Sequence, residues 1–121
     1  MPYTKAWALQ RTVQDAVIAG ELPSTLLMVE HDPVYTLGRR RNAAENLIDV
    51  GDVPVLEVER GGDVTFHGPG QLVVYPILRL EGPWKDLHRV MRALEESAIQ
   101  TCADFGIVAE RDGRNTGAWV N

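Results

Sequence analysis

A glycine-rich segment over residues 60–71 constrains the fold more than any other feature of the sequence. Its twelve residues, Arg-Gly-Gly-Asp-Val-Thr-Phe-His-Gly-Pro-Gly-Gln, include four glycines and one proline. Both residue types disfavour the interior of a helix, because glycine costs backbone entropy and proline lacks an amide hydrogen. The segment is therefore predicted to be a loop, and the residues on either side of it have the composition of strands.

The apolar residues elsewhere predict alternating helices and strands. Helical spacing predicts helices over residues 5–19 and 84–105, each followed by a glycine, where helices commonly end. Pro76 indicates that its strand lies at a sheet edge or bulge. This pattern predicts an α+β (α/β) fold with a mixed sheet and packed helices, in which the helix over 84–105 covers one sheet face. The predicted strands span residues 25–30, 34–37, 55–59, 71–80, 107–109 and 117–120.

Length and charge limit the domain organisation and the partners. A length of 121 residues favours a single domain over residues 1–121, and 12 basic against 17 acidic residues give a net charge of −5. No basic face for nucleic acid, no signal peptide and no apolar run of about 20 residues is found. We therefore expect a cytoplasmic protein that binds neither nucleic acid nor membrane. The single cysteine excludes an internal disulfide and a cysteine zinc site, and no metal or cofactor is expected.

The glycine-rich segment also has the chemistry of a binding site. Glycine lets a ligand approach backbone N–H groups that a Cβ atom would shield. Arg60 adds a forked cationic donor, and His67 adds a group that donates or accepts. A plain turn at Gly-Pro-Gly is the alternative, but the concentration of Arg, Gly-Gly, Thr and His in one segment favours a site.

Three runs of residues resemble the octanoyltransferases of lipoate biosynthesis. They are residues 30–40, Glu-His-Asp-Pro-Val-Tyr-Thr-Leu-Gly-Arg-Arg, the segment 60–71, and residues 74–77, Val-Tyr-Pro-Ile. The resemblance covers about residues 6–120 and implies a fold similar to the catalytic domain of biotin and lipoate protein ligases. It also implies that the acyl substrate is bound by Arg60, Gly61, Gly62, Asp63, Val64, Thr65, Phe66 and His67.

The resemblance further implies a reaction and its partners. Octanoyltransferases move an octanoyl group from acyl carrier protein to a lysine of lipoyl domains, found in 2-oxoacid dehydrogenases and the glycine cleavage H protein. The octanoyl group passes through a cysteine thioester, and a lysine activates the thiol. In the family both residues follow the segment that matches residues 117–120. The resemblance thus implies catalytic groups beyond Asn121, and this chain is expected to be an N-terminal, acyl-binding part of the domain that is inactive alone.

Two alternative functions stay open at this point. One is a ligase-like enzyme that activates lipoate or biotin with ATP, and the other is an acyl-binding module without catalysis. The run His-Gly-Pro-Gly-Gln over residues 67–71 is similar to the transferase pattern, whereas ligases tend to have His-Asp and Gly-Asn there. The transferase is therefore the favoured interpretation.

The long helix contains two residues that need an explanation. Cys102 lies on its apolar stripe, which predicts a buried structural thiol and not a nucleophile. Glu95 lies on the same stripe, and a buried carboxylate needs partners. We expect Arg92, one turn earlier, or the glycine-rich segment to supply them.

Two polar features precede the glycine-rich segment. His31 is expected to make a structural hydrogen bond in preference to a direct contact with substrate. The basic run over residues 39–41 is usually a solvated loop. Because the donor of the resembling family is an acidic carrier protein, the same run is also a candidate landing patch for it.

Overall fold

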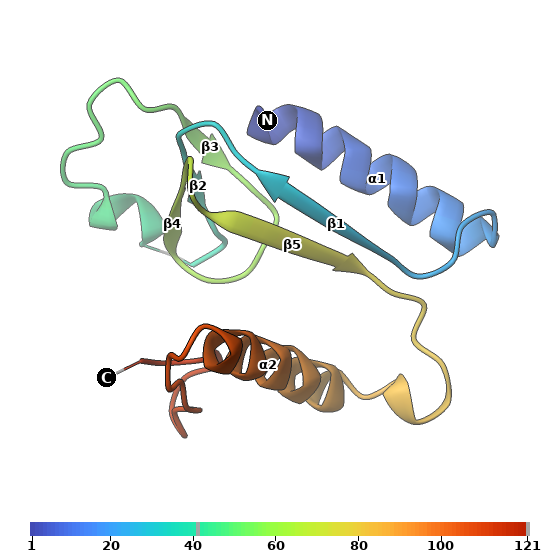
Figure 1. The fold of residues 1–121 in the computed structure, drawn as a ribbon. Helices are drawn as coiled ribbons and strands as arrows, with labels where there is room; N and C mark the ends of the chain where they lie inside the picture. Colours follow the sequence, from blue (N-terminus) through green and yellow to red (C-terminus); the bar gives the residue numbers. More distant parts are fainter. Residues whose placement is uncertain (41, 121) are drawn as a thin grey trace. The chain divides into compact units, whose positions relative to one another are not determined.

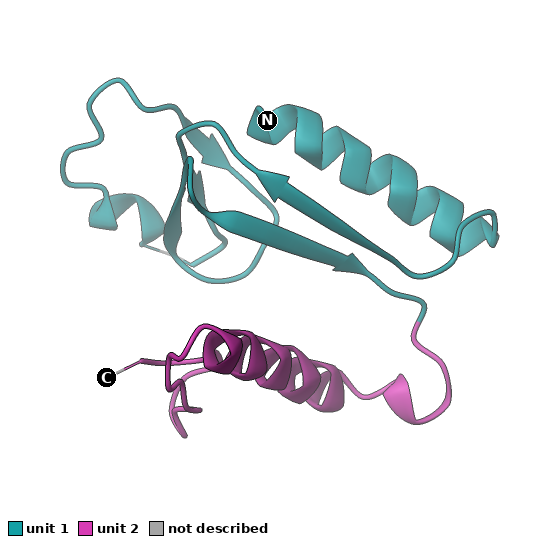
Figure 2. Ribbon diagram, in the orientation of Figure 1, with its two compact units in different colours: residues 1–79 teal, residues 80–121 magenta. Residues whose placement is uncertain are grey.

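The computed structural model describes residues 1–40 and 42–120. It divides into two compact units, Met1–Arg79 and Leu80–Asn121 (Figure 2). Helices and strands occur with both parallel and antiparallel pairing, so the predicted α+β class with mixed pairing is confirmed. The single domain over residues 1–121, and the position of the second helix on the sheet, stay predictions.

Helix α1 (Tyr3–Ala19) begins the first unit, two residues before the predicted start. It buries Ala6, Val13 and Val17, which lie on one helical face. The helix ends at Gly20, whose φ of 79° is the left-handed conformation that glycine adopts without strain. The predicted helix over residues 5–19 is therefore confirmed.

Strands β1 (Thr25–Glu30) and β5 (Leu72–Ile77) pair antiparallel as a two-stranded ribbon that contacts α1 (Figure 1). The predicted strand over residues 25–30 is confirmed, and the one over 71–80 is shorter at both ends. Pro76 lies opposite Leu26. Each strand of a two-stranded ribbon has an open edge, where a proline is tolerated. The edge position predicted from Pro76 is thus confirmed.

The other strands of this unit form a three-stranded sheet. Strand β2 (Val34–Leu37) lies between β3 (Val55–Glu57), to which it is parallel, and β4 (Val64–His67), to which it is antiparallel. A short 3-10 helix, η1 (Ala43–Asn46), lies between β2 and β3 in the chain. The predicted strand over residues 34–37 is confirmed, and β3 is two residues shorter than predicted.

Strand β4 corrects the prediction that residues 60–71 are one loop. The loop is interrupted at residues 64–67, where Val-Thr-Phe-His pairs with β2. Valine, threonine and phenylalanine favour the extended conformation, and β2 offers an edge for pairing. The glycines on either side hid this short strand in the sequence.

The second unit contains η2 (Gly82–Trp84) and helix α2 (Leu87–Asp104). The predicted helix over residues 84–105 is confirmed, but it begins later, because the Asp86 carboxylate accepts hydrogen bonds from the N–H groups of His88 and Arg89. Within the part of the chain that the structure describes, neither α-helix is long and apolar enough to cross a membrane.

The strands predicted over residues 107–109 and 117–120 do not form. Among the described residues of this region, pairing is limited to one antiparallel bridge between Glu110 and Trp119. Glu110 follows the first predicted segment and Trp119 lies within the second, and an isolated pair of short strands is marginally stable. The prediction of two strands is therefore wrong here.

Candidate functional site

The loop over residues 60–63 is fastened to the end of β2 by main-chain hydrogen bonds. The amides of Gly38, Arg39 and Arg40 donate to the carbonyls of residues 63, 60 and 62, at 3.2, 3.0 and 3.1 Å. At Gly38 the two backbones approach so closely that a Cβ atom there would lie 2.3 Å from the Gly62 carbonyl oxygen. Gly62 has a φ of 85°, which favours glycine. Close contact requires glycine at position 38, and backbone conformation favours it at position 62.

The Arg60 side chain fastens this loop to β2. Its Nη2 donates to the carbonyl and the hydroxyl of Thr36, at 2.7 and 2.8 Å, and its Nε donates to the same hydroxyl at 3.3 Å. Nη1 donates to the Gly61 carbonyl at 2.9 Å. Thr36 is fully buried, at 0% exposure. Arg60 therefore has a structural role that sequence reasoning missed, because Thr36 lies 24 residues earlier in the chain.

Gly61 and Gly62 follow Arg60 directly in the chain, and the Gly61 carbonyl accepts a hydrogen bond from its guanidinium. Both residues are exposed, and among the described residues neither amide donates to an acceptor. By contrast, the neighbouring Val64 amide donates to the Asp63 carboxylate at 2.8 Å. Adjacent backbone N–H groups next to an arginine form a donor set for an oxygen atom that carries full or partial negative charge.

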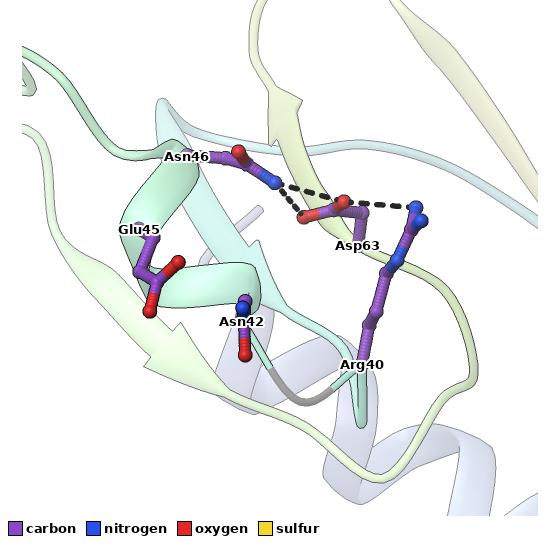
Figure 3. A pocket seen from close by; sticks show the side chains of 5 residues that line it. All are labelled: Arg40, Asn42, Glu45, Asn46 and Asp63. Atoms are coloured by element: carbon purple, nitrogen blue, oxygen red, sulfur yellow. Dashed lines mark hydrogen bonds and ion pairs between the residues drawn. The ribbon is translucent and has the colours of Figure 1, made fainter.

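The Asp63 side chain contacts η1. Asn46 Nδ2 donates to both carboxylate oxygens, at 2.8 and 2.9 Å, and Arg40 pairs with one of them at 3.2 Å (Figure 3). The Asn46 hydrogen bonds, followed by the Val64 amide, lower the pKa of Asp63. Asp63 therefore links the end of η1, at Asn46, to Arg40. A shallow recess of about 590 Å³ is lined here by Arg40, Asn42, Glu45, Asn46 and Asp63.

Strand β4 divides the remaining predicted site residues between two faces of the sheet. Successive side chains of a strand alternate, and directly paired residues share a face. Thr65 and His67 lie on the face of Thr36, which is also the face that Arg60 contacts. Val64 and Phe66 lie on the opposite face, where Phe66 packs against its pair Tyr35 with ring centroids 5.1 Å apart. The eight predicted residues thus cannot all present side chains to one small ligand.

His67 belongs to a cluster of four rings drawn from four parts of the first unit: Tyr3, His31, His67 and Tyr75. The His67 ring centroid lies 5.4 Å from that of His31 and 5.9 Å from that of Tyr3. His31 is 1% exposed, and its Nε2 lies 2.8 Å from the Tyr75 hydroxyl. Its Nδ1 lies 3.3 Å from the Met1 carbonyl. The structural hydrogen bond predicted for His31 is confirmed. No local pattern in the sequence predicts that Tyr3 joins this cluster.

Burial sets the protonation of the His31–Tyr75 pair. Desolvation lowers the pKa of His31 from its ordinary 6.5 and raises the pKa of Tyr75 to about 12. Tyr75 therefore stays protonated. Because the Met1 carbonyl can only accept, the neutral His31 ring donates from Nδ1 and accepts from Tyr75 at Nε2.

The buried His31 predicts acid sensitivity. The unfolded chain protonates this ring near pH 6.5, whereas the folded chain protonates it only at lower pH. The stabilisation is complete above 6.5 and is lost as the pH falls through the folded pKa. Urea unfolding at pH values above and below 6.5 should show that the free energy of unfolding declines at low pH. His31→Gln should make this decline smaller. The exposed His88→Gln is the control, and an unchanged decline in His31→Gln would contradict the prediction.

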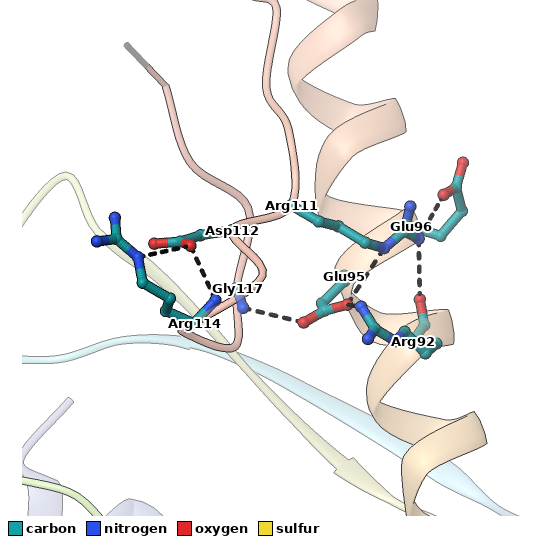
Figure 4. A network of polar contacts seen from close by, with 7 residues as sticks. All are labelled: Arg92, Glu95, Glu96, Arg111, Asp112, Arg114 and Gly117. Atoms are coloured by element: carbon teal, nitrogen blue, oxygen red, sulfur yellow. Dashed lines mark hydrogen bonds and ion pairs between the residues drawn. The ribbon is translucent and has the colours of Figure 1, made fainter.

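The second unit contains a buried carboxylate, Glu95, which is 7% exposed (Figure 4). It accepts hydrogen bonds from the Gly117 amide at 3.1 Å, Arg92 at 3.1 Å and Arg111 at 3.2 Å. The Gly117 amide, followed by Arg92, lowers the pKa of Glu95. Arg111 also contacts Glu96, at 2.6 Å. The predicted burial of Glu95 with Arg92 is confirmed, and the network holds residues 111–117 against α2.

One further expectation concerns Cys102. Cys102 lies on α2 but is only half-buried, so the prediction of a buried thiol is wrong in degree. Its neighbours on the apolar stripe, Leu94 and Phe105, are themselves exposed. No three His, Cys, Asp or Glu side chains of the described residues lie close enough together to hold a metal ion.

Comparison with known proteins identifies the family. The model of the lipoyl protein ligase A/B catalytic domain matches residues 2–121. The octanoyltransferase of Geobacter metallireducens is 48% identical over 100% of this chain and 56% of that protein. Those of Gloeobacter violaceus and Mycolicibacterium smegmatis are 47% and 48% identical over 99% of this chain and 54% and 51% of their own lengths.

The matches bear directly on the sequence motifs. This chain spans about half the length of the curated relatives it matches. The resemblance to octanoyltransferases that the segments 30–40, 60–71 and 74–77 indicate is confirmed by these relatives. On these grounds the chain belongs to the family of the lipoyl protein ligase A/B catalytic domain.

Proposed function

We propose that this chain forms the acyl-binding part of an octanoyltransferase, which moves an octanoyl group from acyl carrier protein to a lysine of a lipoyl domain. The proposal rests on Gly61 and Gly62, two exposed residues beside Arg60 whose amides donate to no acceptor among the described residues. The carbonyl oxygen of a thioester gains negative charge when it is attacked, and preorganised N–H donors stabilise that charge. The names of the relatives favour the transferase over a ligase.

An apolar pocket of about 280 Å³ in the first unit supports binding of a hydrocarbon chain. Tyr3, which lines it, also packs against His67. Each buried CH2 group of an acyl chain contributes about 0.8 kcal/mol to binding. A pocket that shares Tyr3 with the ring cluster of His67 suits a ligand with a polar head and an apolar tail. The pocket is lined by Pro2, Tyr3, Thr4, Asp32, Pro33, Val34, Pro54 and Leu56.

We place the catalytic cysteine and lysine of the thioester route outside residues 1–121. A nucleophilic thiol is activated by a nearby cation and is open to its substrate. Cys102 is half-buried on α2, and the lysines of the chain are Lys5 and Lys85. The acceptors proposed are the lipoyl domains of 2-oxoacid dehydrogenases and the glycine cleavage H protein, and the location proposed is the cytoplasm.

The exposed Arg39 and Arg40 are proposed to attract the acidic carrier protein. They adjoin the loop over residues 60–63 through their main-chain hydrogen bonds. Part of the Arg40 charge is offset by Asp63, at 3.2 Å. Arg41, the third residue of the basic run, lies outside the described residues. Charges of this kind act mainly on the rate of encounter and its salt dependence.

The substitution Gly61→Val tests acyl binding. Gly61 has no positive φ, and a Cβ atom there meets nothing within 4 Å, so valine adds bulk over the exposed amides without strain. We expect the affinity of the chain for octanoyl-pantetheine, measured by calorimetry, to fall at least about ten-fold while the unfolding free energy changes by less than about 0.5 kcal/mol. Gly113→Val is the matched control, because position 113 is equally open. Equal affinity of Gly61→Val and the unsubstituted chain would contradict the proposal.

A further inference from the structure

The turn that follows β4 returns the side chain of Gln71 to His67. Pro69 and Gly70 occupy its central positions, and the Gln71 amide donates to the Gly68 carbonyl at 3.2 Å. Gly70 has a φ of 86°, as the third residue of a type II turn requires, and proline presets the φ of the second residue. A Cβ atom at Gly68 would lie 2.8 Å from the Phe66 ring. The geometry thus depends on the Gly-Pro-Gly sequence.

The amide of Gln71 has one orientation that satisfies both of its neighbours. Its Nε2 donates to the Phe66 carbonyl at 3.4 Å, and its Oε1 lies 2.7 Å from His67 Nδ1. The reversed amide would set its oxygen against the Phe66 carbonyl oxygen, and both of these atoms only accept. Since Oε1 accepts, Nδ1 must donate. The neutral His67 ring therefore carries its hydrogen on Nδ1.

The other nitrogen of His67 is then an acceptor that is open to solvent. Within the described part of the chain, no hydrogen-bond partner faces Nε2. Every buried side-chain nitrogen or oxygen atom of the described residues has a partner. Because His67 is half-buried and its Nε2 has none, that atom must be accessible. His31 differs, since the Tyr75 hydroxyl occupies its Nε2.

We propose that Gln71 is a positioning residue, which holds neutral His67 as the Nδ1–H tautomer and so keeps Nε2 as an acceptor for an N–H or O–H donor of the substrate. The identity of that donor rests on the proposed function. In acyl transfer to a lysine, the attacking amine carries N–H groups, and an acceptor lone pair orients such an amine. The tautomer itself follows from Gln71 and Phe66 alone.

Nitrogen NMR of the chain labelled with 15N-histidine tests the tautomer directly. The sequence has three histidines, so the ring signals are few. In the neutral state, the His67 Nδ1 should show the shift of a protonated nitrogen and Nε2 that of an unprotonated one. His31 should give the same pattern in every variant and serves as the internal control. A wild-type His67 ring with its hydrogen on Nε2 would overturn the proposal, whatever the variants do.

Two variants assign the tautomer to the side chain of Gln71. Gln71→Leu removes the acceptor, and the ratio of Nδ1–H to Nε2–H tautomer should fall about five-fold, the worth of one ordinary hydrogen bond. Gln71→Glu keeps an oxygen opposite Nδ1 but sets its second oxygen against the Phe66 carbonyl oxygen, so it should restore the ratio at least in part. An unchanged ratio in Gln71→Leu would refute the role of Gln71. The measurement needs no ligand, so a failure of octanoyl-pantetheine binding would contradict the proposed function and leave this result standing.

Discussion

Replacing Gly38 with valine should lower the free energy of unfolding by about 3 kcal/mol or more and abolish acyl binding. The new Cβ atom would lie 2.3 Å from the Gly62 carbonyl oxygen and 2.8 Å from Arg60 Nη1. A flexible side chain can move aside, but the Gly62 carbonyl is part of a backbone that three hydrogen bonds hold against residues 38–40. The loop must therefore separate from β2 for valine to fit.

Urea unfolding and octanoyl-pantetheine binding measure the two effects of Gly38→Val. Gly61→Val is the control for folding, because a Cβ atom at that position meets nothing within 4 Å. We expect Gly38→Val to lose both stability and binding, whereas Gly61→Val loses binding alone. Wild-type stability in Gly38→Val would show that the two backbones do not approach as described.

Replacing Arg60 with methionine should lower the free energy of unfolding by about 1–3 kcal/mol. Methionine keeps an unbranched apolar stem but removes every donor to Thr36, which is fully buried, and the donor to the Gly61 carbonyl. Buried acceptors that lose a charged donor cannot recover it from water. The free energy of unfolding of Arg60→Lys should lie between those of the unsubstituted chain and Arg60→Met, because one ammonium cannot reproduce the planar fork of the guanidinium.

Arg40→Met is the matched control for Arg60→Met. Arg40 pairs with Asp63 at 3.2 Å, but its side chain is 72% exposed. Exposed ion pairs contribute about 0–1 kcal/mol, so urea unfolding should separate the two variants. Equal losses would mean that Arg60 acts as a surface charge and not as the fastening of the loop.

Local patterns in the sequence predicted most of the fold. Helices α1 and α2 and strands β1 and β2 were predicted from the spacing of their apolar residues. That spacing reflects which face of each element is buried, and it can be recognised within a short stretch of sequence. Strand β4 was missed because its four residues lie between glycines and need β2 for pairing. The strands predicted over 107–109 and 117–120 were wrong for a related reason, since a strand depends on a neighbour that local sequence does not reveal.

The candidate site was visible in its residue types but not in its contacts. Arg60 and His67 stood out because their chemistry and the adjacent glycines are unusual in one segment. Their hydrogen-bond partners come from other elements: Thr36 for Arg60, and Tyr75 for His31, the neighbour of His67. Nothing in the sequence near Thr36 or Tyr75 indicates these contacts. The division of Thr65 from Phe66 followed only from the strand register. A sequence therefore indicates the chemistry of such a site before its geometry.

The pairing of β1 with β5 has a consequence for how the site becomes ordered. The ribbon joins two strands that bracket residues 31–71, the stretch that contains β2, β3, β4, the glycine loop and both ring histidines. Contacts between residues so far apart in the chain give the topology a high contact order. Closing so long a stretch costs chain entropy before contacts between β1 and β5 can offset it. The ribbon holds the two ends of this stretch together. Its strands cannot separate without releasing both ends of the segment that positions Arg60 and His67.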